Sequence, residues 1–205
     1  MNINIPPVTQ ALLLANVLVY FLMMLLGDGP FLQLALWPLG MEGFNVSFMP
    51  WQLVTYSFLH GGLGHLFLNM LVLVMFGGEI ERLFGSRWFA AYFFVCVVSA
   101  AIVQLAVRAI TAGPIGPTMG ASGGTIGLLL AFGMYFPQRR VMLLILPIPM
   151  PAWVAVVLFT VLTLIFGVTG TFAGIAHFAH LGGMIGGFLM IQHRRGHWPF
   201  PRRRR

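Results

Sequence analysis

The stretch Gly120-Ala121-Ser122-Gly123-Gly124-Thr125-Ile126-Gly127 separates a loop with two prolines from an apolar run. It predicts a helix whose first turn contains Ser122. A hydroxyl there sits beside backbone N–H groups that have no intrahelical partner, at the positive end of the helix dipole, where a developing anion is stabilised. The glycines remove side chains that would block a substrate backbone. Taken alone, the stretch is more simply explained as a packing face, since glycine and serine let membrane helices approach closely.

The composition predicts a polytopic membrane protein. Of the 205 residues, 59% are hydrophobic and only 7% are charged, whereas about a quarter of a soluble domain is charged. The length fits one compact domain, which we expect to cover residues 1–192. No Lys or Arg precedes the first apolar segment, so we expect no cleaved signal peptide. The single cysteine, Cys96, lies within an apolar segment, and we expect it to pack in the core.

We predict an all-α bundle of six transmembrane helices, since a membrane span needs about 20 apolar residues or somewhat fewer. The expected spans are 11–26, 63–84, 88–107, 120–136, 152–168 and 175–191. The fourth is only about 25 Å long at 1.5 Å per residue, which is less than the roughly 30 Å of a hydrocarbon core. One of its ends must therefore lie inside the protein. We expect Ser122 to lie below the membrane surface, in a hydrated cavity.

Two connecting segments are expected to lie in the membrane interface. The long first loop, residues 27–61, contains runs rich in aromatics and leucine, at 31–39 and 51–59. Trp and Tyr prefer the interface, so this loop should dip into it. The apolar run 141–148 is too short to span the bilayer, so we expect it to be interfacial as well.

The arginines predict the orientation. The net charge is +7 and every basic residue is Arg, and these residues cluster at the ends of apolar segments, which favours a topology signal over a nucleic-acid surface. With the N-terminus inside, only Arg108 of the eleven falls outside. The positive-inside rule then places both termini in the cytoplasm. The basic tail 193–205 is expected to be disordered. It could also contact anionic lipid, although orientation explains its charge more simply.

Histidines mark the second and sixth spans. Ionisable groups within a span are costly, so they are functional candidates by default. His65 and Asn69 are spaced i, i+4 and share one helical face, and His60 lies at the junction with the first loop. In the sixth span His177 and His180 are three residues apart. We expect a structural role for His177.

The sixth span is suited to pack against the fourth. Gly182, Gly183, Gly186 and Gly187 form two overlapping small-xxx-small patterns, which allow close helix approach. A serine at one helix start and His180 on a closely packed neighbour could form an activated nucleophile. His65, Asn69 and the Ser122 backbone N–H would then be donors for an oxyanion. The fourth and sixth spans contain no carboxylate, so the arrangement would be a dyad and not a triad.

Three motifs occur in chain order on the expected spans: His65-Leu-Phe-Leu-Asn69, Gly120-Ala-Ser122-Gly123 and Ala179-His180-Leu-Gly-Gly183-Met-Ile-Gly-Gly187. With these motifs the chain resembles the rhomboid intramembrane serine proteases, from the first loop to the sixth span.

The resemblance implies a six-span bundle of the bacterial type, in the cytoplasmic membrane, that cleaves transmembrane segments of single-pass proteins. It implies a dyad of Ser122 and His180. The oxyanion site would use His65, Asn69 and the Ser122 backbone, with Gly120 shaping the approach and His60 behind it. It implies no metal and no cofactor, and membrane lipid and substrate proteins as partners.

Two positions depart from the pattern of many family members. Gln52 follows Trp51 where an arginine is common, and Ile126 stands where an aromatic stacks on the catalytic histidine. We expect the first change to affect the stability of the first loop. We expect the second to leave His180 less firmly oriented.

Other functions compete with proteolysis. A non-enzymatic relative could bind and escort membrane helices, but relatives of this kind typically lose the serine or the histidine. A metal transporter could use the four histidines His60, His65, His177 and His180, but the spans lack carboxylates to assist them. A zinc protease would need His-Glu-x-x-His, which is absent, and an aspartyl protease would need an intramembrane Asp, whereas the only Asp is Asp28.

Overall fold

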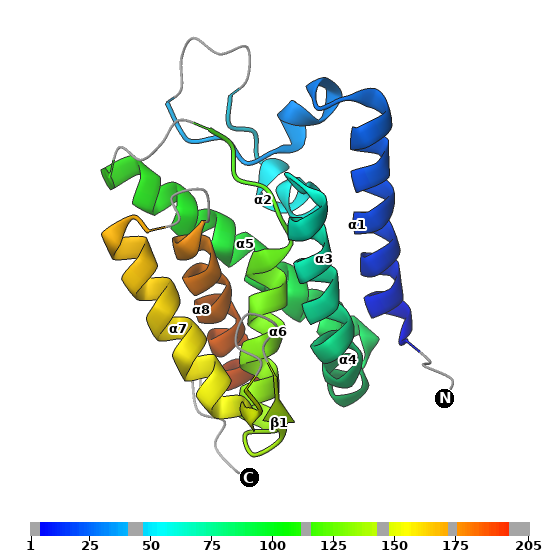
Figure 1. Cartoon of the computed structure of the whole chain (residues 1–205), viewed down its shortest axis with the longest axis vertical. Helices are drawn as coiled ribbons and strands as arrows, with labels where there is room; N and C mark the ends of the chain where they lie inside the picture. Colours follow the sequence, from blue (N-terminus) through cyan, green and yellow to red (C-terminus); the bar gives the residue numbers. More distant parts are fainter. Residues whose placement is uncertain (1–4, 41–46, 112–115, 143–147, 172–175, 197–205) are drawn as a thin grey trace.

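The structure, a computed structural model, describes residues 5–40, 47–111, 116–142, 148–171 and 176–196 (Figure 1). Helices dominate this part of the chain, which confirms the all-α prediction. The helical elements are α1 (Pro7–Leu26), η1 (Gly29–Leu34), α2 (Gln52–Thr55), η2 (Tyr56–Phe58), α3 (Leu63–Val72), η3 (Leu73–Gly77), α4 (Gly78–Phe84), α5 (Ser86–Thr111), α6 (Ser122–Tyr135), α7 (Ala152–Thr169) and α8 (His177–Arg194). Two short strands, β1 (Arg140–Val141) and β2 (Met150–Pro151), pair antiparallel.

Four of the described helical runs are long and apolar enough to cross a membrane: α1, the continuous run Leu63–Phe84, α5 and α7. The two remaining expected spans correspond to α6 and α8. Helix α6 has only 14 residues, and α8 carries three His, one Gln and one Arg among its 18 residues. Helix α6 is apolar but too short for a full span, and α8 is long enough but too polar. The count of six crossings therefore depends on these two helices.

The helix boundaries differ from the expected ones at several ends. Helix α1 begins at Pro7 and not at residue 11, because proline fits the first turn of a helix. Helix α8 continues through Arg194, past the expected domain boundary at 192. Most of the expected interfacial run 141–148 lies outside the described residues, as do residues 197–205 of the basic tail.

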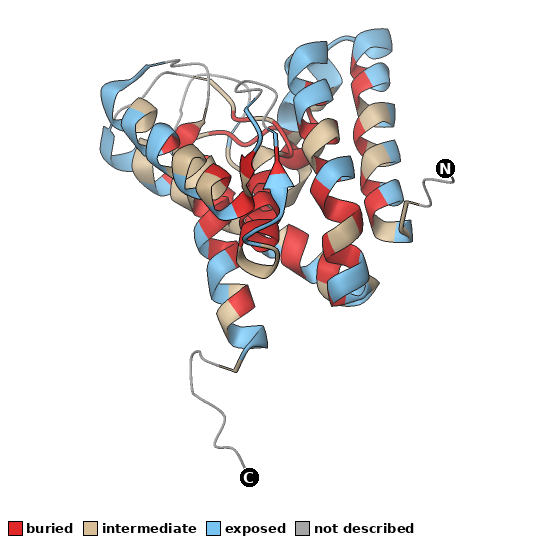
Figure 2. Ribbon diagram, turned by 60° about the horizontal axis from the view of Figure 1, so that its bottom comes forward, coloured by how far each residue is buried: buried red, intermediate tan, exposed pale blue. Residues whose placement is uncertain are grey.

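Helix α6 lies at the centre of the bundle. It contacts α3, α5, α7 and α8, while α1 packs at one edge (Figure 1). Eleven of the 14 residues of α6 are buried, and its ribbon is almost continuously in the buried colour in Figure 2. The glycines of α6 let α5 approach: a Cβ at Gly124 would meet the Phe93 ring, and one at Gly127 would meet the Cys96 side chain. Cys96 therefore packs in the core, as predicted.

The start of α1 is attached to the bundle by Glu81 of α4. Pro6, the residue before the helix, provides no side-chain cap. Instead, the Glu81 carboxylate accepts hydrogen bonds from the Val8 N–H at 3.0 Å and from the Thr9 N–H and hydroxyl at 2.7 and 2.8 Å. The Ser86 hydroxyl donates a fourth, at 2.7 Å. A buried carboxylate thus caps the positive end of a helix that otherwise contacts the bundle along a single stripe.

We expect Glu81→Ala to lower the free energy of unfolding by about 2–4 kcal/mol, because four donors lose an ionised acceptor and some become buried without a partner. Thermal or SDS unfolding in detergent micelles measures this. Glu79→Ala is the matched control: Glu79 is 38% exposed and pairs with the half-exposed Arg139, so its loss should cost less than about 1 kcal/mol. Equal losses for the two variants would contradict the capping role.

Candidate active site

Ser122 is the first residue of α6, so it lies in the first turn of a helix as its stretch of sequence predicted, and its side chain is half-buried. The preceding residue, Ala121, provides no side-chain cap to the helix. The backbone N–H groups of the first turn therefore face the region around the serine without a capping side chain. Such a helix start attracts a negative charge.

Gly120 holds the backbone just before the serine. Its φ of 124° lies in a region that favours glycine, and a Cβ here would lie 2.6 Å from His65 Cε1. The expected helix start at residue 120 is thus wrong by two residues, because this backbone is not helical. The space that a side chain at residue 120 would fill is occupied by the imidazole of His65, which belongs to α3.

The first loop fixes this backbone from the other side. Leu36 and Thr118 exchange two backbone hydrogen bonds, at 3.0 and 2.9 Å, and the Gly120 N–H donates to the Tyr56 carbonyl at 3.0 Å. The Tyr56 hydroxyl in turn donates to the Val97 carbonyl of α5 at 2.8 Å. The loop between α1 and α3 therefore helps to set the position of Ser122.

Gln52 anchors the same loop. Its side chain is fully buried, its oxygen accepts from the Trp37 N–H at 3.1 Å, and its nitrogen donates to the carbonyls of Gln33 and Ser47. The bonds to Trp37 and Gln33 reach 15 and 19 residues back along the chain, and the bond to Ser47 reaches five. Both polar atoms of the buried Gln52 side chain therefore have hydrogen-bond partners.

Helices α6 and α8 touch through their backbones. They run side by side in the same direction in Figure 1, and a Cβ at Gly183 would lie within 3.0 Å of the Gly123 carbonyl oxygen. Ser122 precedes Gly123, and His180 lies one turn before Gly183. This contact brings the starts of the two helices together, as the small-xxx-small patterns predicted. Within the described ranges, no hydrogen bond joins the Ser122 and His180 side chains.

Helix α3 presents His65 and Asn69 to the first turn of α6, as their spacing predicted. His65 is exposed and lies against Gly120, while Asn69 is 5% exposed. The Asn69 amide donates to the His65 carbonyl at 3.0 Å, and its oxygen accepts from the Thr125 hydroxyl at 3.0 Å. Two side chains that could donate to an anion thus lie on the α3 side of the serine.

His60 lies behind His65. It is 2% exposed, and the two imidazole rings meet edge to face with centroids 5.0 Å apart. Neither ring nitrogen of His60 has a hydrogen-bond partner among the described residues. Burial, together with the neighbouring His65, lowers the pKa of the His60 imidazole to about 4, so this ring is neutral at neutral pH.

The aromatic neighbour of His180 comes from α7. The Phe159 ring lies 5.9 Å from the His180 ring at a tilt of 42°. Ile126, the residue one turn after the serine, is buried in a cluster with Leu130 and Met184, against which Phe159 also packs. His180 therefore has an aromatic contact even though Ile126 cannot supply one.

His177 lies next to His180 and is bonded to the segment that follows α7. Its ring nitrogen is 3.0 Å from the Thr171 carbonyl, just beyond the end of α7, and its ring is edge-on to His180 at 6.3 Å. It connects α7 to α8, which agrees with the structural role that we predicted. Among the described residues, no three His, Cys, Asp or Glu side chains gather as metal ligands would.

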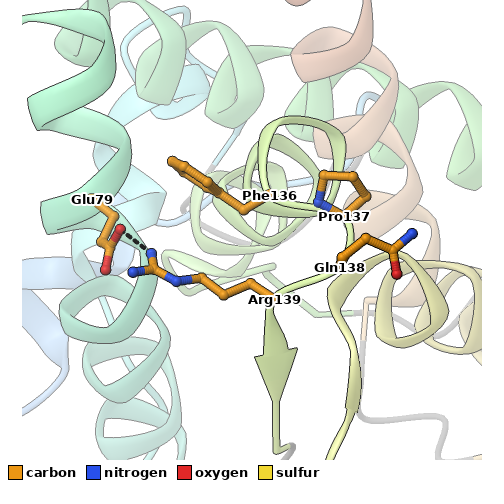
Figure 3. A pocket seen from close by; sticks show the side chains of 5 residues that line it. All are labelled: Glu79, Phe136, Pro137, Gln138 and Arg139. Atoms are coloured by element: carbon orange, nitrogen blue, oxygen red, sulfur yellow. Dashed lines mark hydrogen bonds and ion pairs between the residues drawn. The ribbon is translucent and has the colours of Figure 1, made fainter.

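A cavity of about 500 Å³ lies far from Ser122 (Figure 3). It is lined by Glu79, Arg139 and the residues between α6 and β1. Figure 3 shows Arg139 reaching to Glu79, and its guanidinium also lies 5.4 Å from the centre of the Phe136 ring. The length of α6, about 20 Å at 1.5 Å per residue, separates this cavity from the serine. We therefore assign no chemistry to it.

Sequence reasoning missed Thr125, Phe159 and Tyr56. Thr125 lies within the stretch that drew attention first, but its partner is on another helix. Phe159 is one of nineteen phenylalanines, and nothing in the sequence distinguishes it from residues that face lipid. The contacts of all three arise from the packing between elements.

Comparison with known proteins points to one family. The Rhomboid domain model matches residues 47–195. Rhomboid protein 1, mitochondrial, of Saccharomyces cerevisiae is 31% identical over 139 residues, which are 67% of this chain and 40% of that protein. Rhomboid protease GlpG of Serratia proteamaculans is 29% identical over 185 residues, 90% of this chain and 61% of that protein. The GlpG of Klebsiella pneumoniae is 28% identical over 192 residues, 91% of this chain and 63% of that protein.

The chain thus spans less than two thirds of the length of these relatives. The family model covers most of this chain, including all of α3, α6 and α8. These are the three helices that bring His65, Ser122 and His180 to one end of the bundle. The chain belongs to the rhomboid family.

Proposed function

We propose that this protein is an intramembrane serine endopeptidase that cleaves transmembrane segments of other membrane proteins with a dyad of Ser122 and His180. The observation that carries the proposal is the backbone contact between Gly123 and Gly183. This contact brings together the starts of α6 and α8, which carry Ser122 and His180, and so supports the pairing of these two residues. Family membership supports the same reaction class.

The reaction follows from these groups. The Ser122 oxygen attacks the carbonyl carbon of the scissile bond while a ring nitrogen of His180 takes the hydroxyl proton. The carbonyl oxygen becomes an oxyanion, and as the C–N bond breaks the protonated His180 gives its proton to the leaving amine. Water then attacks the acyl-enzyme, His180 takes a proton from it, and the serine leaves with that proton. Both residues return to their starting states.

The oxyanion would be stabilised by the Ser122 backbone N–H, His65 and Asn69. Donors aimed at developing charge act strongly where water is excluded, and Asn69 is buried and bonded to Thr125, three residues after the serine. Gly120 has no side chain to block the approach of a substrate backbone. His60, neutral and buried, supports the position of His65 from behind.

We propose six membrane crossings, with α6 and α8 as the fourth and sixth and with the segment from α1 to α3 in the interface. Both the start of α1 and the end of α8 lie at the end of the bundle opposite Ser122 (Figure 1). Arg194 there donates to the carbonyls of Leu83 and Phe84 at the end of α4, and Arg195 donates to the Met134 carbonyl of α6. We assign this end to the cytoplasmic side of a bacterial inner membrane.

The substrates that we propose are single-pass membrane proteins, with membrane lipid as the surrounding partner. A scissile bond within a helix is protected by the helical hydrogen bonds, so the substrate must unwind locally before the serine can reach a carbonyl. The domain would comprise residues 1–192 with a short basic tail on the cytoplasmic side. The chemistry needs neither a metal nor a cofactor.

One observation favours a second function. Among the described residues no hydrogen bond joins Ser122 to His180, which is the geometry expected of a non-catalytic protein that binds and escorts membrane helices. Catalytic hydrogen bonds are often long before substrate binds, and the chain carries the serine, the histidine and the donors that the reaction needs. We therefore favour the protease.

Labelling by a fluorophosphonate tests the proposal. An activated serine attacks this reagent, and mass spectrometry should locate the modification on Ser122. In parallel, the purified protein in liposomes should cleave a reporter transmembrane segment at one position. Absence of both labelling and cleavage across several reporter segments would favour the escort function.

A further inference from the structure

We propose that Thr125 is a positioning residue: its hydroxyl fixes the Asn69 amide so that a side-chain N–H is available to the oxyanion. The inference rests on the proposed function and adds a residue to it. Thr125 lies in the first turn of α6, three residues after Ser122, and its side chain is 1% exposed. It does not touch the reacting atoms itself.

The hydrogen bonds around Asn69 determine how its amide is turned. The Nδ2 group donates to the His65 carbonyl of the preceding turn of α3 at 3.0 Å. If the amide were flipped, its oxygen would face that carbonyl, and two acceptors would repel each other. The Oδ1 atom therefore points to the other side. There it meets the Thr125 hydroxyl at 3.0 Å.

The direction of this second bond follows. An amide oxygen only accepts, so the Thr125 hydroxyl must be the donor. The alternative acceptor for its proton is the Ser122 carbonyl, at 3.4 Å, which is the longer of the two bonds. A bond between two helices thus holds the amide. Of the two Nδ2 protons, one is used by the His65 carbonyl and the second remains for a substrate oxygen.

Without the Thr125 hydroxyl the amide would lose its orientation. Its oxygen would lie in a site that is 5% exposed with one fewer donor, and the side chain would turn to other rotamers. A donor that is preorganised for the oxyanion contributes to the transition state more than to substrate binding. We therefore expect kcat to fall and KM to stay nearly constant.

The test is a double-mutant cycle in the full chain, with cleavage of a reporter transmembrane segment as the readout. We expect Thr125→Val to lower kcat by about 10- to 100-fold with KM changed less than about threefold, since a lost oxyanion donor costs up to 10²–10³. Thr125→Ser, which keeps the hydroxyl, should restore most of the rate. The variant Thr125→Val, Asn69→Ala should be no slower than Asn69→Ala alone, because both changes remove the same donor.

Thr9→Val is the matched control, because the Thr9 hydroxyl is also buried and also donates to a side chain on another helix, the Glu81 carboxylate of α4. It should lower the unfolding temperature and leave kcat at the wild-type value. If the valine variant at residue 125 does not fold, Thr125→Ala removes the same hydroxyl without the branched methyl groups.

Two outcomes would overturn the role of Thr125. In the first, the variant without the Thr125 hydroxyl has the kcat of wild type. In the second, Thr125→Val slows Asn69→Ala by the same factor by which it slows wild type. If wild type and Ser122→Ala cleave equally, the proposed protease function fails and the role of Thr125 fails with it. If Ser122→Ala is inactive and Thr125→Val is not impaired, only the role of Thr125 fails.

Discussion

Ser122→Ala is expected to reduce kcat for cleavage of a reporter transmembrane segment by at least about 10⁴-fold and to abolish fluorophosphonate labelling. His180→Ala should have a similar effect, because a hydroxyl is a weak nucleophile without a base to take its proton. The double variant should be little slower than either single variant, since residues that act as a unit are not additive. Rates in liposomes, with product masses by mass spectrometry, measure all three.

Ser57→Ala is the control for this prediction. The Ser57 hydroxyl is also buried and donates to the Val54 carbonyl at 2.7 Å, but it lies in the first loop and not at a helix start. Its loss should leave labelling intact. Cleavage by Ser122→Ala at more than a hundredth of the wild-type rate would mean that another group attacks the substrate, and the dyad would then be wrong.

Local patterns in the sequence predicted where the helices lie and which of their faces pack against neighbours. The i, i+4 spacing of His65 and Asn69 correctly placed both on the face of α3 that meets α6. The glycine spacing around Gly183 correctly predicted the close contact with α6. These inferences succeeded because each depends only on the periodicity of one helix and on the size of its side chains.

The sequence could not reveal which groups on different helices pair with one another. Glu81 carries a charge at the end of an apolar segment. Only the fold shows that its carboxylate accepts the Thr9 N–H and so caps the start of α1. The approach of Phe159 to His180 and of Thr125 to Asn69 also depends on how neighbouring helices are rotated about their axes. A single residue type at one position contains no information about that rotation.

Packing also supplies contacts at the two positions that depart from the family pattern. Gln52 makes its own three hydrogen bonds within the first loop, and α7 supplies an aromatic ring to His180. The expectation that Ile126 leaves His180 less firmly oriented did not consider this neighbour on another helix, and it stays a prediction. The aromatic contact that Ile126 cannot make is made by a residue on another element of the bundle.

Gly183→Ala is the second change for which we expect a large effect. A methyl group at this position would lie within 3.0 Å of the Gly123 carbonyl oxygen, and backbone atoms at both sites leave no side chain that could move aside. The two helices would have to separate by about 1 Å, a displacement that costs on the order of 10²-fold in rate when it misplaces a reacting group. Overpacking should also lower the free energy of unfolding by about 1–3 kcal/mol. Reporter cleavage and SDS unfolding measure the two effects separately.

Gly78→Ala distinguishes this mechanism from a general effect of replacing helical glycines. Gly78 also lies within a helical run, but the nearest atom to an added Cβ is Pro6 Cδ at an ordinary contact distance of 3.4 Å. Alanine is the better helix former by up to about 1 kcal/mol, so this variant should be at least as stable as wild type and cleave at the same rate. If Gly183→Ala were equally active and stable, the contact between α6 and α8 would not be what holds His180 beside Ser122.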